Sequence, residues 1–240
     1  MSFEINIDKD KNHFTNRKVI CINVVMEADF WIKRWEGGQI AFHENEINAH
    51  LQNFWPKLDL PKGSQILVPL CGKTNDLLWL LKEGYKVLGV EISEIAVRDF
   101  FEENNLKPVI KGSTWCYNDD LKIICGNLFD LEESDFNKID GVYDRASLIA
   151  LPTQMRFMYA QLINKIIDSD SKILLVTFEY NQSEMNGPPF SVTKDEVLEL
   201  YMADFDIKEV YYSEILKRNP QFKARGLTAL TERVFEMQRR

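Results

Sequence analysis

Apolar and polar positions follow two different periods along most of the chain. Ile66-Leu67-Val68 is a short apolar run that predicts a strand, and residues 75–82 carry an apolar cluster that predicts a helix closed by Gly84. Residues 86–92 predict the next strand, and residues 94–104 predict a helix with apolar side chains on one face. Strands that alternate with helices in this way indicate a parallel sheet covered by helices.

The second half of the chain continues this alternation, and several elements again have a local signal. Thr193 with Glu196 three residues later is a capping-box pattern, which predicts the start of a helix. Asn118-Asp119-Asp120 is a turn sequence whose Asn and Asp tolerate positive φ, so it predicts a small hairpin. The elements predicted here are a hairpin of residues 116–117 and 122–125, strands at 141–144 and 171–178, helices at 153–167 and 193–202, a Pro-Pro loop at 186–190, and an antiparallel pair of edge strands at 207–212 and 231–237.

Residues 1–25 do not share this order. They mix Asn, Asp and Lys with one apolar stretch, residues 19–25, and show neither a helical nor a strand period. Met26, followed by Glu-Ala-Asp-Phe-Trp, looks like a natural beginning. We therefore interpret residues 1–25 as an extension, either poorly ordered or read from an upstream start, and residues 26–240 as the functional domain.

The composition of the 240 residues is that of one globular domain. Hydrophobic residues make up 45% and charged residues 28%, which is enough for a full core. No apolar run approaches the roughly 20 residues of a membrane span, and the N-terminus lacks the apolar core of a signal peptide. The four cysteines form no C-x-x-C pair and only three histidines are present, so we expect no metal site and a reducing, cytoplasmic environment.

The formal net charge of −8 argues against a nucleic-acid partner, because phosphate backbones are bound by clustered Lys and Arg. The sequence contains no basic stripe. An acidic balance is compatible with a cationic cofactor, although net charge decides solubility more than function. We therefore expect a small-molecule partner, and neither a nucleic acid nor a membrane.

The loop after the first strand lies where open α/β sheets bind their ligands, at the carboxyl ends of the strands. It reads Val68-Pro69-Leu70-Cys71-Gly72-Lys73-Thr74. Gly72-Lys73-Thr74 does not belong to a phosphate-binding P-loop, because that motif needs a glycine five residues before Gly72 and residue 67 is Leu. The loop therefore predicts a pocket of another kind.

Glu91, at the end of the second predicted strand, follows Gly72 by 19 residues. An acid at about this spacing binds a ribose in dinucleotide enzymes, so Glu91 alone does not decide between ligands. A pyrophosphate requires close backbone approach at a second glycine, whereas residues 69–71 contain none. S-adenosylmethionine has ribose hydroxyls and no phosphates, so the loop favours it over a dinucleotide. The alternative role for Glu91 is to cap the helix that begins near Ser93.

Trp31 and Trp35 stand at i and i+4, which places them on one helix face, where a core-facing aromatic pair is one interpretation. Together with five other motifs, however, this segment resembles the thiopurine S-methyltransferase family, and its bacterial members in particular. The resemblance runs from about Met26 to the C-terminus. The six motifs, in order, are residues 30–43, Pro69-Leu70-Cys71-Gly72-Lys73, Val90-Glu91-Ile92-Ser93, Asp144-Arg145-Ala146-Ser147-Leu148, Gly187-Pro188-Pro189-Phe190 and Ala224-Arg225-Gly226-Leu227.

The resemblance implies the fold of class I S-adenosylmethionine-dependent methyltransferases. This is a Rossmann-like α/β fold, doubly wound, with a mostly parallel seven-stranded sheet, helices on both faces and an antiparallel edge strand. The resemblance also implies a monomeric enzyme that uses S-adenosyl-L-methionine to methylate the sulfur of a small aromatic thiol.

The same resemblance assigns roles to particular residues, and we take Arg145 as the candidate catalytic residue. Phe42 and Pro189 would line the acceptor pocket, and Arg225 with Arg145 would steady a thiolate or a ring nitrogen. The chain departs from the family at Asn127 and Ala41, which leaves the acceptor pocket less well defined than the reaction. The residues that would contact the cofactor are Trp31 and Trp35, Leu70 and Gly72 along its methionine part, Glu91 at the ribose, Asn127 and Leu128 beside the adenine, and Arg145.

Methyl transfer from a sulfonium is an in-line displacement in which a thiolate attacks, so we expect positioning to dominate catalysis. For Arg145 and Arg225 the alternative role is a salt bridge with a nearby carboxylate. His43 could act as a general base, but a structural hydrogen bond to its helix is the simpler interpretation. We interpret Cys71 as a buried packing residue and not as a methyl acceptor.

Other functions fit parts of the sequence. The acceptor could be a chalcogen oxyanion, hydrogen sulfide, thiocyanate or a halide instead of an aromatic thiol. A nicotinamide-dependent oxidoreductase would use the same sheet edge, but the missing glycines disfavour it. A cofactor-binding protein without catalysis is a further alternative.

Overall fold

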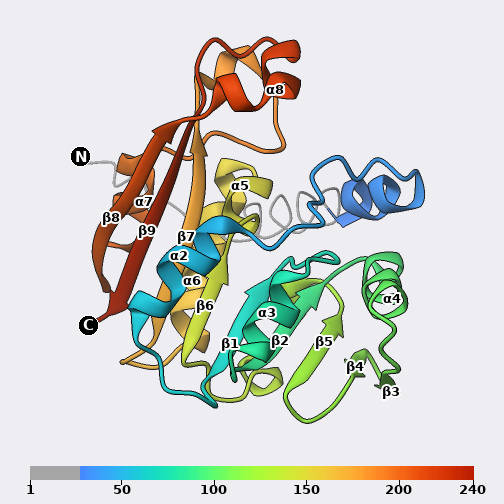
Figure 1. Ribbon diagram of the computed structural model, residues 1–240. Helices are drawn as coiled ribbons and strands as arrows, with labels where there is room; N and C mark the ends of the chain where they lie inside the picture. Colours follow the sequence, from blue (N-terminus) through green and yellow to red (C-terminus); the bar gives the residue numbers. More distant parts are fainter. Residues whose placement is uncertain (1–27) are drawn as a thin grey trace, which may run out of the picture. The chain divides into compact units, whose positions relative to one another are not determined.

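The computed structural model of the chain describes residues 28–240 (Figure 1). Residues 1–25, interpreted above as an extension, lie outside the described residues, so that interpretation stays a prediction. The chain separates into two compact units, Met1–Ile40 and Ala41–Arg240.

In the first unit, residues 28–36 are helical. The helix ends at a glycine pair, because the N–H of Gly37 donates to the carbonyl of Lys33 at 2.9 Å and Gly38 has a φ of 64°, a left-handed value that glycine adopts readily. Trp31 and Trp35 are four residues apart on this helix and therefore share one of its faces.

The second unit is built on a nine-stranded sheet within the described residues (Figure 1). Its five central strands, β5, β2, β1, β6 and β7, are parallel to one another. In spatial order the strands are β3 (Val109–Lys111), β4 (Thr114–Cys116), β5 (Leu121–Cys125), β2 (Lys86–Glu91), β1 (Gln65–Pro69), β6 (Gly141–Asp144), β7 (Lys172–Glu179), β9 (Thr231–Arg239) and β8 (Phe205–Glu214).

The parallel, doubly wound α/β sheet confirms the predicted fold class, but the expected number of seven strands is wrong. Antiparallel strands extend the sheet at both edges, β4 and β3 beyond β5, and β9 and β8 beyond β7. β3 gave no sequence signal because it is only three residues long and all three are exposed, so its pattern has no buried face.

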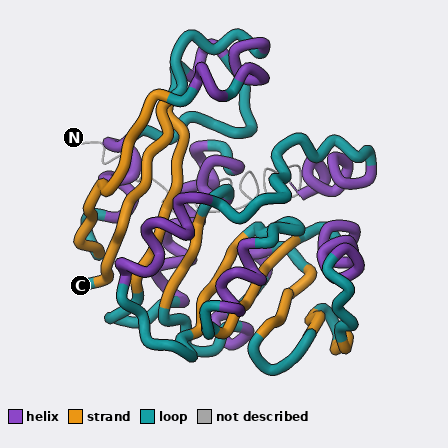
Figure 2. The backbone as a smooth tube through the Cα atoms, viewed as in Figure 1, coloured by secondary structure: helices purple, strands orange, loops and turns teal. Residues whose placement is uncertain are grey.

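Helices cover both faces of this sheet, as expected (Figure 2). On one face, Leu51, Leu77 and Phe100 from α2, α3 and α4 join a single buried cluster with the sheet. On the other face, α6 contacts β6 through a hydrogen bond between Tyr159 and Asp144. The helices are α2 (Ala49–Phe54), α3 (Asp76–Lys82), α4 (Glu94–Glu103), α5 (Ser147–Ala150), α6 (Thr153–Ile166), α7 (Lys194–Tyr201) and α8 (Pro220–Ala224), with 3-10 turns η1 (Trp55–Leu58), η2 (Leu128–Asp130), η3 (Glu133–Asp135), η4 (Gln182–Glu184) and η5 (Leu216–Arg218).

Trp55 anchors the core on the α2 face. Its side chain is fully buried, and its ring lies edge-on to the rings of Tyr85 and Tyr143, with centroids 6.0 and 6.1 Å away. Edge-to-face aromatic pairs of this kind contribute about 0.5–1.5 kcal/mol beyond the burial of their area. This packing holds α2 and η1 against β6, the strand that carries Arg145 at its end.

Local capping signals predicted the helix ends in part. Thr193 Oγ1 accepts from the N–H of Glu196 at 3.2 Å, which confirms the start of α7. The Glu196 carboxylate does not return to the backbone of Thr193, because it binds the buried guanidinium of Arg156 at 2.6 and 2.7 Å. The predicted capping box is therefore only half formed.

No helix in residues 28–240 combines the length and the apolar character that crossing a membrane requires.

Candidate cofactor and acceptor site

The site predicted from the sequence lies at the carboxyl ends of the central strands. β1 has β2 on one side and β6 on the other, so the chain moves outward from β1 in opposite directions. Such a switch in strand order opens a crevice at the carboxyl edge of a parallel sheet. Loops 70–75, 92–93, 126–127 and 145–146 all leave the sheet at this edge.

Glu91 joins the first of these loops to the second strand. Its Oε2 accepts from the N–H of Gly72 at 2.7 Å, and its Oε1 accepts from the N–H of Ser93 at 2.8 Å. Burial raises the pKa of this carboxyl, while hydrogen bonds from the backbone of Ser93, Gly72 and Ile92 pull the pKa down in part. Ser93 itself caps α4 through its hydroxyl, so Glu91 is not the helix cap that the sequence left as an alternative.

Four backbone N–H groups in and just after the first loop donate hydrogen bonds within the protein. Those of Cys71 and Gly72 donate to the second strand at 3.0 and 2.7 Å, and those of Thr74 and Asp76 donate within the loop at 3.2 Å each. Phosphate sites at strand-to-helix loops depend on such N–H groups pointing at the ligand. These four N–H groups are therefore not available to a phosphate, and the loop presents the Glu91 carboxylate to a ligand.

The loop has a tight backbone that brings Leu70 and Gly72 to the edge of the sheet. Both residues have left-handed φ values, 46° and 53°. Between them, the Cys71 side chain is buried and lies over Gly89, where an added Cβ would stand 2.9 Å from its sulfur. Burial raises the pKa of the Cys71 thiol well above its ordinary value. A buried thiol of this kind fits the packing role expected for Cys71.

Asn127 and Leu128 follow β5 beside Glu91. The N–H of Gly126 donates to the Glu91 carbonyl at 2.8 Å, and Asn127 Oδ1 caps η2 by accepting from the N–H of Phe129 at 3.1 Å. Leu128 is buried. A Cβ added at Gly126 would meet nothing within 4 Å, so the sheet edge is open at this point.

Arg145 stands in a turn formed by the motif Asp144–Leu148, whose conformation the sequence did not predict. Asp144 Oδ1 accepts from the N–H groups of Ser147 and Leu148 at 3.0 and 3.3 Å, and Asp144 Oδ2 accepts from Tyr159 Oη at 2.6 Å. Ser147 Oγ donates to the carbonyl of Pro69 at 2.8 Å, which ties this turn to the first loop. An acid at the end of a strand, three residues before a short helix, is the signal that identifies such a turn.

The Arg145 guanidinium forms an ion pair with Glu44. This is the salt bridge that the sequence analysis left open as an alternative role. The Glu44 side chain is 60% exposed and that of Arg145 is 21% exposed, so the pair faces solvent at the carboxyl edge. Nothing local in the sequence connects the two residues, because they are far apart along the chain.

The segment between residues 41 and 48 also carries Phe42 and His43. Phe42 is 40% exposed. His43 Nε2 lies 3.1 Å from Asn45 Oδ1. This bond is the structural one expected for His43, except that both partners lie in a loop and not on a helix. Burial and the charge of Lys73 lower the pKa of His43.

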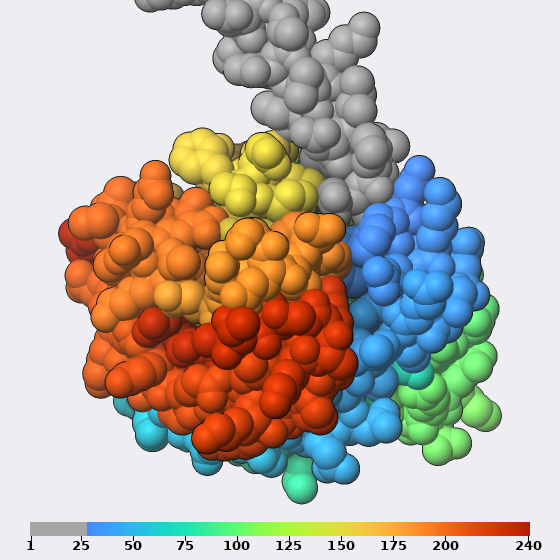
Figure 3. Space-filling view, turned by 90° about the horizontal axis from the view of Figure 1, so that it is seen from above, coloured from blue at the N-terminus to red at the C-terminus, as the bar shows by residue number. Residues whose placement is uncertain are grey.

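The predicted Pro-Pro loop forms a rigidly held wall after β7. Tyr180 Oη donates to the carbonyl of Pro189 at 2.7 Å, and Arg225 Nη2 donates to that of Pro188 at 3.3 Å. The N–H of Phe190 donates to the carbonyl of Ile149 in α5 at 2.6 Å, which places the wall beside the turn of Arg145. Seen from above, the orange segment after β7 lies between the yellow α5 region and the red α8 region (Figure 3).

Arg225 thus contributes to the wall through a backbone carbonyl, and its guanidinium carbon lies 5.8 Å from the ring centre of Phe222. Gln182 is a further residue of the wall that the sequence analysis missed. Its Nε2 donates to the carbonyl of Met185 at 2.7 Å and its Oε1 accepts from the N–H of Ser191 at 2.9 Å, so one amide joins both ends of the loop.

Trp31 and Trp35 belong to the first compact unit, on the helix of residues 28–36. Their contact with the cofactor stays a prediction. Residues 28–240 contain no group of three or more His, Cys, Asp or Glu side chains that could hold a metal ion.

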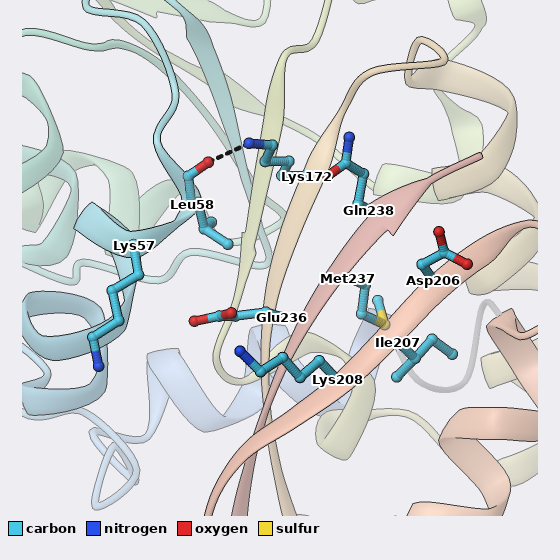
Figure 4. Close-up of a pocket in the computed structure, with 9 residues that line it drawn as sticks. All are labelled: Lys57, Leu58, Lys172, Asp206, Ile207, Lys208, Glu236, Met237 and Gln238. Atoms are coloured by element: carbon cyan, nitrogen blue, oxygen red, sulfur yellow. Dashed lines mark hydrogen bonds between the residues drawn. The ribbon is translucent and has the colours of Figure 1, made fainter.

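A groove at the amino end of β7 is separate from this site (Figure 4). Lys172 donates to the carbonyl of Leu58, and Asp206 pairs with Arg240 at 3.3 Å. Because these groups have partners and lie at the opposite end of the strands, we do not assign the groove to the candidate site. It is lined by Lys57, Leu58, Lys172, Asp206, Ile207, Lys208, Glu236, Met237 and Gln238.

Comparisons of the sequence with known proteins agree on one family. A sequence model of the family described as Thiopurine S-methyltransferase (TPMT) matches residues 26–240. The chain is 43% identical to the thiopurine S-methyltransferase of Nitrosomonas eutropha, over 89% of this chain and 99% of the relative. It is 45% identical to that of Marinobacter nauticus, over 88% of this chain and 99% of the relative.

Two solved methyltransferases have a similar fold at low sequence identity. The 1,6-didemethyltoxoflavin-N1-methyltransferase of Burkholderia thailandensis, solved with S-adenosylhomocysteine, has a TM-score of 0.59 at 15% identity and covers 100% of this chain and 93% of that one. An S-adenosylmethionine-dependent methyltransferase from Methanosarcina mazei has a TM-score of 0.58 at 18% identity, over 81% and 98% of the two chains. These likenesses show the fold.

Proposed function

The chain belongs to the thiopurine S-methyltransferase family and is an S-adenosylmethionine-dependent methyltransferase, and from this premise we propose that it methylates the sulfur of small aromatic or heterocyclic thiols. The observation that carries the proposal is a fixed cation, Arg145, beside a wall of prolines and an aromatic ring. A flat anionic acceptor suits this combination of charge and apolar surface.

The residues at the carboxyl edge fit an adenosyl cofactor. Each oxygen of a carboxylate can accept two hydrogen bonds, so Glu91 keeps acceptor capacity for ribose hydroxyls while the N–H groups of Gly72 and Ser93 hold it in place. The open edge at Gly126, next to Asn127 and the apolar Leu128, suits the flat adenine ring.

Leu70 and Gly72 would lie along the methionine part of the cofactor, and Trp31 and Trp35 would cover it. When bound, the cofactor supplies an electrophilic methyl group on a sulfonium sulfur. What the protein must add is a dry, aligned path for the acceptor sulfur, because in-line displacement depends chiefly on positioning.

On the acceptor side, Arg145 would hold the negative charge of the thiolate, which is the attacking form. Phe42 and Pro189 would contact the two faces of the acceptor ring, and Arg225 would fix the wall through Pro188. Heterocyclic thiols ionise near neutral pH with modest help, so a guanidinium that favours the anion is sufficient and a strong general base is not required.

Calorimetric titration with S-adenosylmethionine and with NAD tests the cofactor site. We expect binding of S-adenosylmethionine and none of NAD. A panel of acceptors, comprising a thiopurine, an aliphatic thiol, selenite, thiocyanate and iodide, then tests the acceptor by release of S-adenosylhomocysteine. Turnover of selenite or iodide without turnover of the thiopurine would contradict the proposal and favour a small inorganic acceptor.

We further propose that the enzyme acts as a monomer in the cytoplasm. The three cysteines among the described residues, Cys71, Cys116 and Cys125, carry free thiols, which suits a reducing compartment. Sedimentation at micromolar concentration is expected to give the mass of one chain, 28.1 kDa. A dimer at that concentration would contradict this part of the proposal.

A further inference from the structure

The ion pair between Glu44 and Arg145 places a carboxylate of the protein on the very cation that an anionic acceptor would use. Glu44 lies in the loop before α2, on the same segment as Phe42. The two residues therefore come from opposite parts of the chain to one point at the mouth of the acceptor site.

The loop of Glu44 is tied down on its C-terminal side. Asn75 Nδ2 donates to the carbonyl of Asn45 at 2.9 Å, and the N–H of Asn48 donates to Asp76 Oδ1 at 2.8 Å. Asn48 Oδ1 in turn caps α2. Because its neighbours are held in this way, the Glu44 carboxylate stays close to the Arg145 guanidinium.

Arg145 is held equally firmly through its backbone. Asp144 accepts two backbone N–H groups from α5, and Ser147 Oγ donates to the carbonyl of Pro69. The turn therefore keeps its shape when the guanidinium exchanges one anionic partner for another. Only side-chain rotation is needed to release Glu44.

We propose that Glu44 is a specificity-determining residue for the methyl acceptor, because its carboxylate occupies Arg145 until an acceptor with its own negative charge replaces it. This inference rests on the proposed function and adds to it that Glu44 competes with the acceptor for Arg145. An acceptor that carries a formal negative charge exchanges one ion pair for another, whereas a neutral acceptor has no charge with which to displace Glu44.

The exposure of the pair sets the size of the effect. Glu44 is 60% exposed, and exposed ion pairs correspond to a factor of up to about five in an equilibrium constant. A contact of this strength is weak enough for a bound thiolate to replace it. It is also strong enough to be seen as a change in the acceptor KM.

The test compares Glu44→Gln with Glu46→Gln, which removes the same charge from an exposed residue of the same segment. With 6-mercaptopurine as acceptor, we expect Glu44→Gln to lower the acceptor KM by about threefold and to change the KM for S-adenosylmethionine less. Glu44→Ala is expected to do the same. Glu46→Gln is expected to change neither constant.

A double-mutant cycle with Arg145→Gln isolates the pair. In the Arg145→Gln background, Glu44→Gln is expected to have no further effect on the acceptor KM. Equal effects of Glu44→Gln and Glu46→Gln, or an undiminished effect in that background, would overturn the inference while leaving thiol methylation intact. Absence of turnover of any aromatic thiol by the unmodified protein would instead remove the proposed function, and the inference with it.

Discussion

The N–H of Gly72 donates to Glu91 Oε2 across 2.7 Å, so the first loop and the end of the second strand act as one structural unit. The carboxylate is buried and has its position set by the backbone before any ligand arrives. A ligand that binds Glu91 therefore meets a preorganised acceptor and not a mobile side chain.

Glu91→Gln is expected to weaken binding of S-adenosylmethionine by about 1.5–3 kcal/mol, the range for hydrogen bonds to a charged group. Calorimetric titration measures the change. Glu94→Gln, three residues further on and exposed, is the matched control and is expected to bind as the unmodified protein does. Unchanged affinity in Glu91→Gln would remove Glu91 from the ribose site.

Arg145→Ala is expected to raise the acceptor KM by at least about tenfold, because a charge-assisted contact to the thiolate is lost. The KM for S-adenosylmethionine should change less. Steady-state kinetics with a thiopurine separates the two constants, and Arg98→Ala on the exposed side of α4 serves as the control. Kinetics identical to the unmodified protein would show that Arg145 has only its salt bridge to Glu44.

Tyr180→Phe is expected to raise the acceptor KM about fivefold, because the wall loses the hydrogen bond that Tyr180 Oη donates to the carbonyl of Pro189. The affinity for S-adenosylmethionine should change less, because the hydrogen bonds of Tyr180 Oη run to Pro189 and Gln182 of the wall. Tyr117→Phe, at an exposed tyrosine, is the control. An equal change in both constants would indicate a general loss of structure instead.

Tyr159→Phe is expected to lower the free energy of unfolding by about 1–3 kcal/mol, because it leaves Asp144 Oδ2 without its donor in a buried environment. Urea unfolding at neutral pH measures the loss. A change below about 0.5 kcal/mol would mean that water replaces the hydroxyl.

The same variant has a defined pH dependence. Burial raises the pKa of Asp144 above its ordinary value, and the hydrogen bond from Tyr159 opposes that rise. A raised carboxyl pKa gives a contribution to stability that is complete below about 3.8 and is lost as the pH increases through the folded-state pKa. Without Tyr159 Oη this pKa rises further, so the destabilisation in Tyr159→Phe should grow with pH across that range.

His43 is expected to titrate below pH 6.5 in the folded protein. Burial and the charge of Lys73 disfavour the imidazolium, with Arg145 acting in the same direction, while the bond to Asn45 and the charge of Glu103 partly oppose them. Between the lowered pKa and 6.5 the unfolded chain binds more protons than the folded one, so stability is lost as pH falls through this window. NMR titration of the imidazole measures the midpoint, with the urea-unfolded chain as reference.

Most of the sheet could be predicted because its signals are local. β6 has the predicted bounds, Gly141–Asp144, and α4 buries the four apolar residues of its predicted face, Ala96, Val97, Phe100 and Phe101. These elements depend on periodicity and capping within a few residues. β3 and α5 were missed because one is wholly exposed and the other forms around the Asp144 turn.

The residues of the candidate site likewise divide into those that local signals predict and those that depend on tertiary contacts. Glu91 was predictable because a strand end followed by a helix start locates it, and the sequence spacing to Gly72 matches the hydrogen bond. The Glu44 partner of Arg145 and the Gln182 clamp on the Pro-Pro loop were not predictable, because each depends on tertiary contacts that leave no period or motif in the sequence.

The hydrogen bonds of the first loop's N–H groups also affect how well the site discriminates between its cofactor and other adenosine compounds. ATP, ADP and NAD offer the same base and ribose that Glu91 and Leu128 are suited to hold. Each also brings phosphates toward a loop in which the N–H groups of Cys71 and Gly72 are already bonded and the Glu91 carboxylate would repel them. We expect such nucleotides to be poor inhibitors even where they greatly outnumber the methyl donor. The hydrogen bonds that stiffen this loop would therefore also make the site selective against the abundant nucleotides that resemble its cofactor.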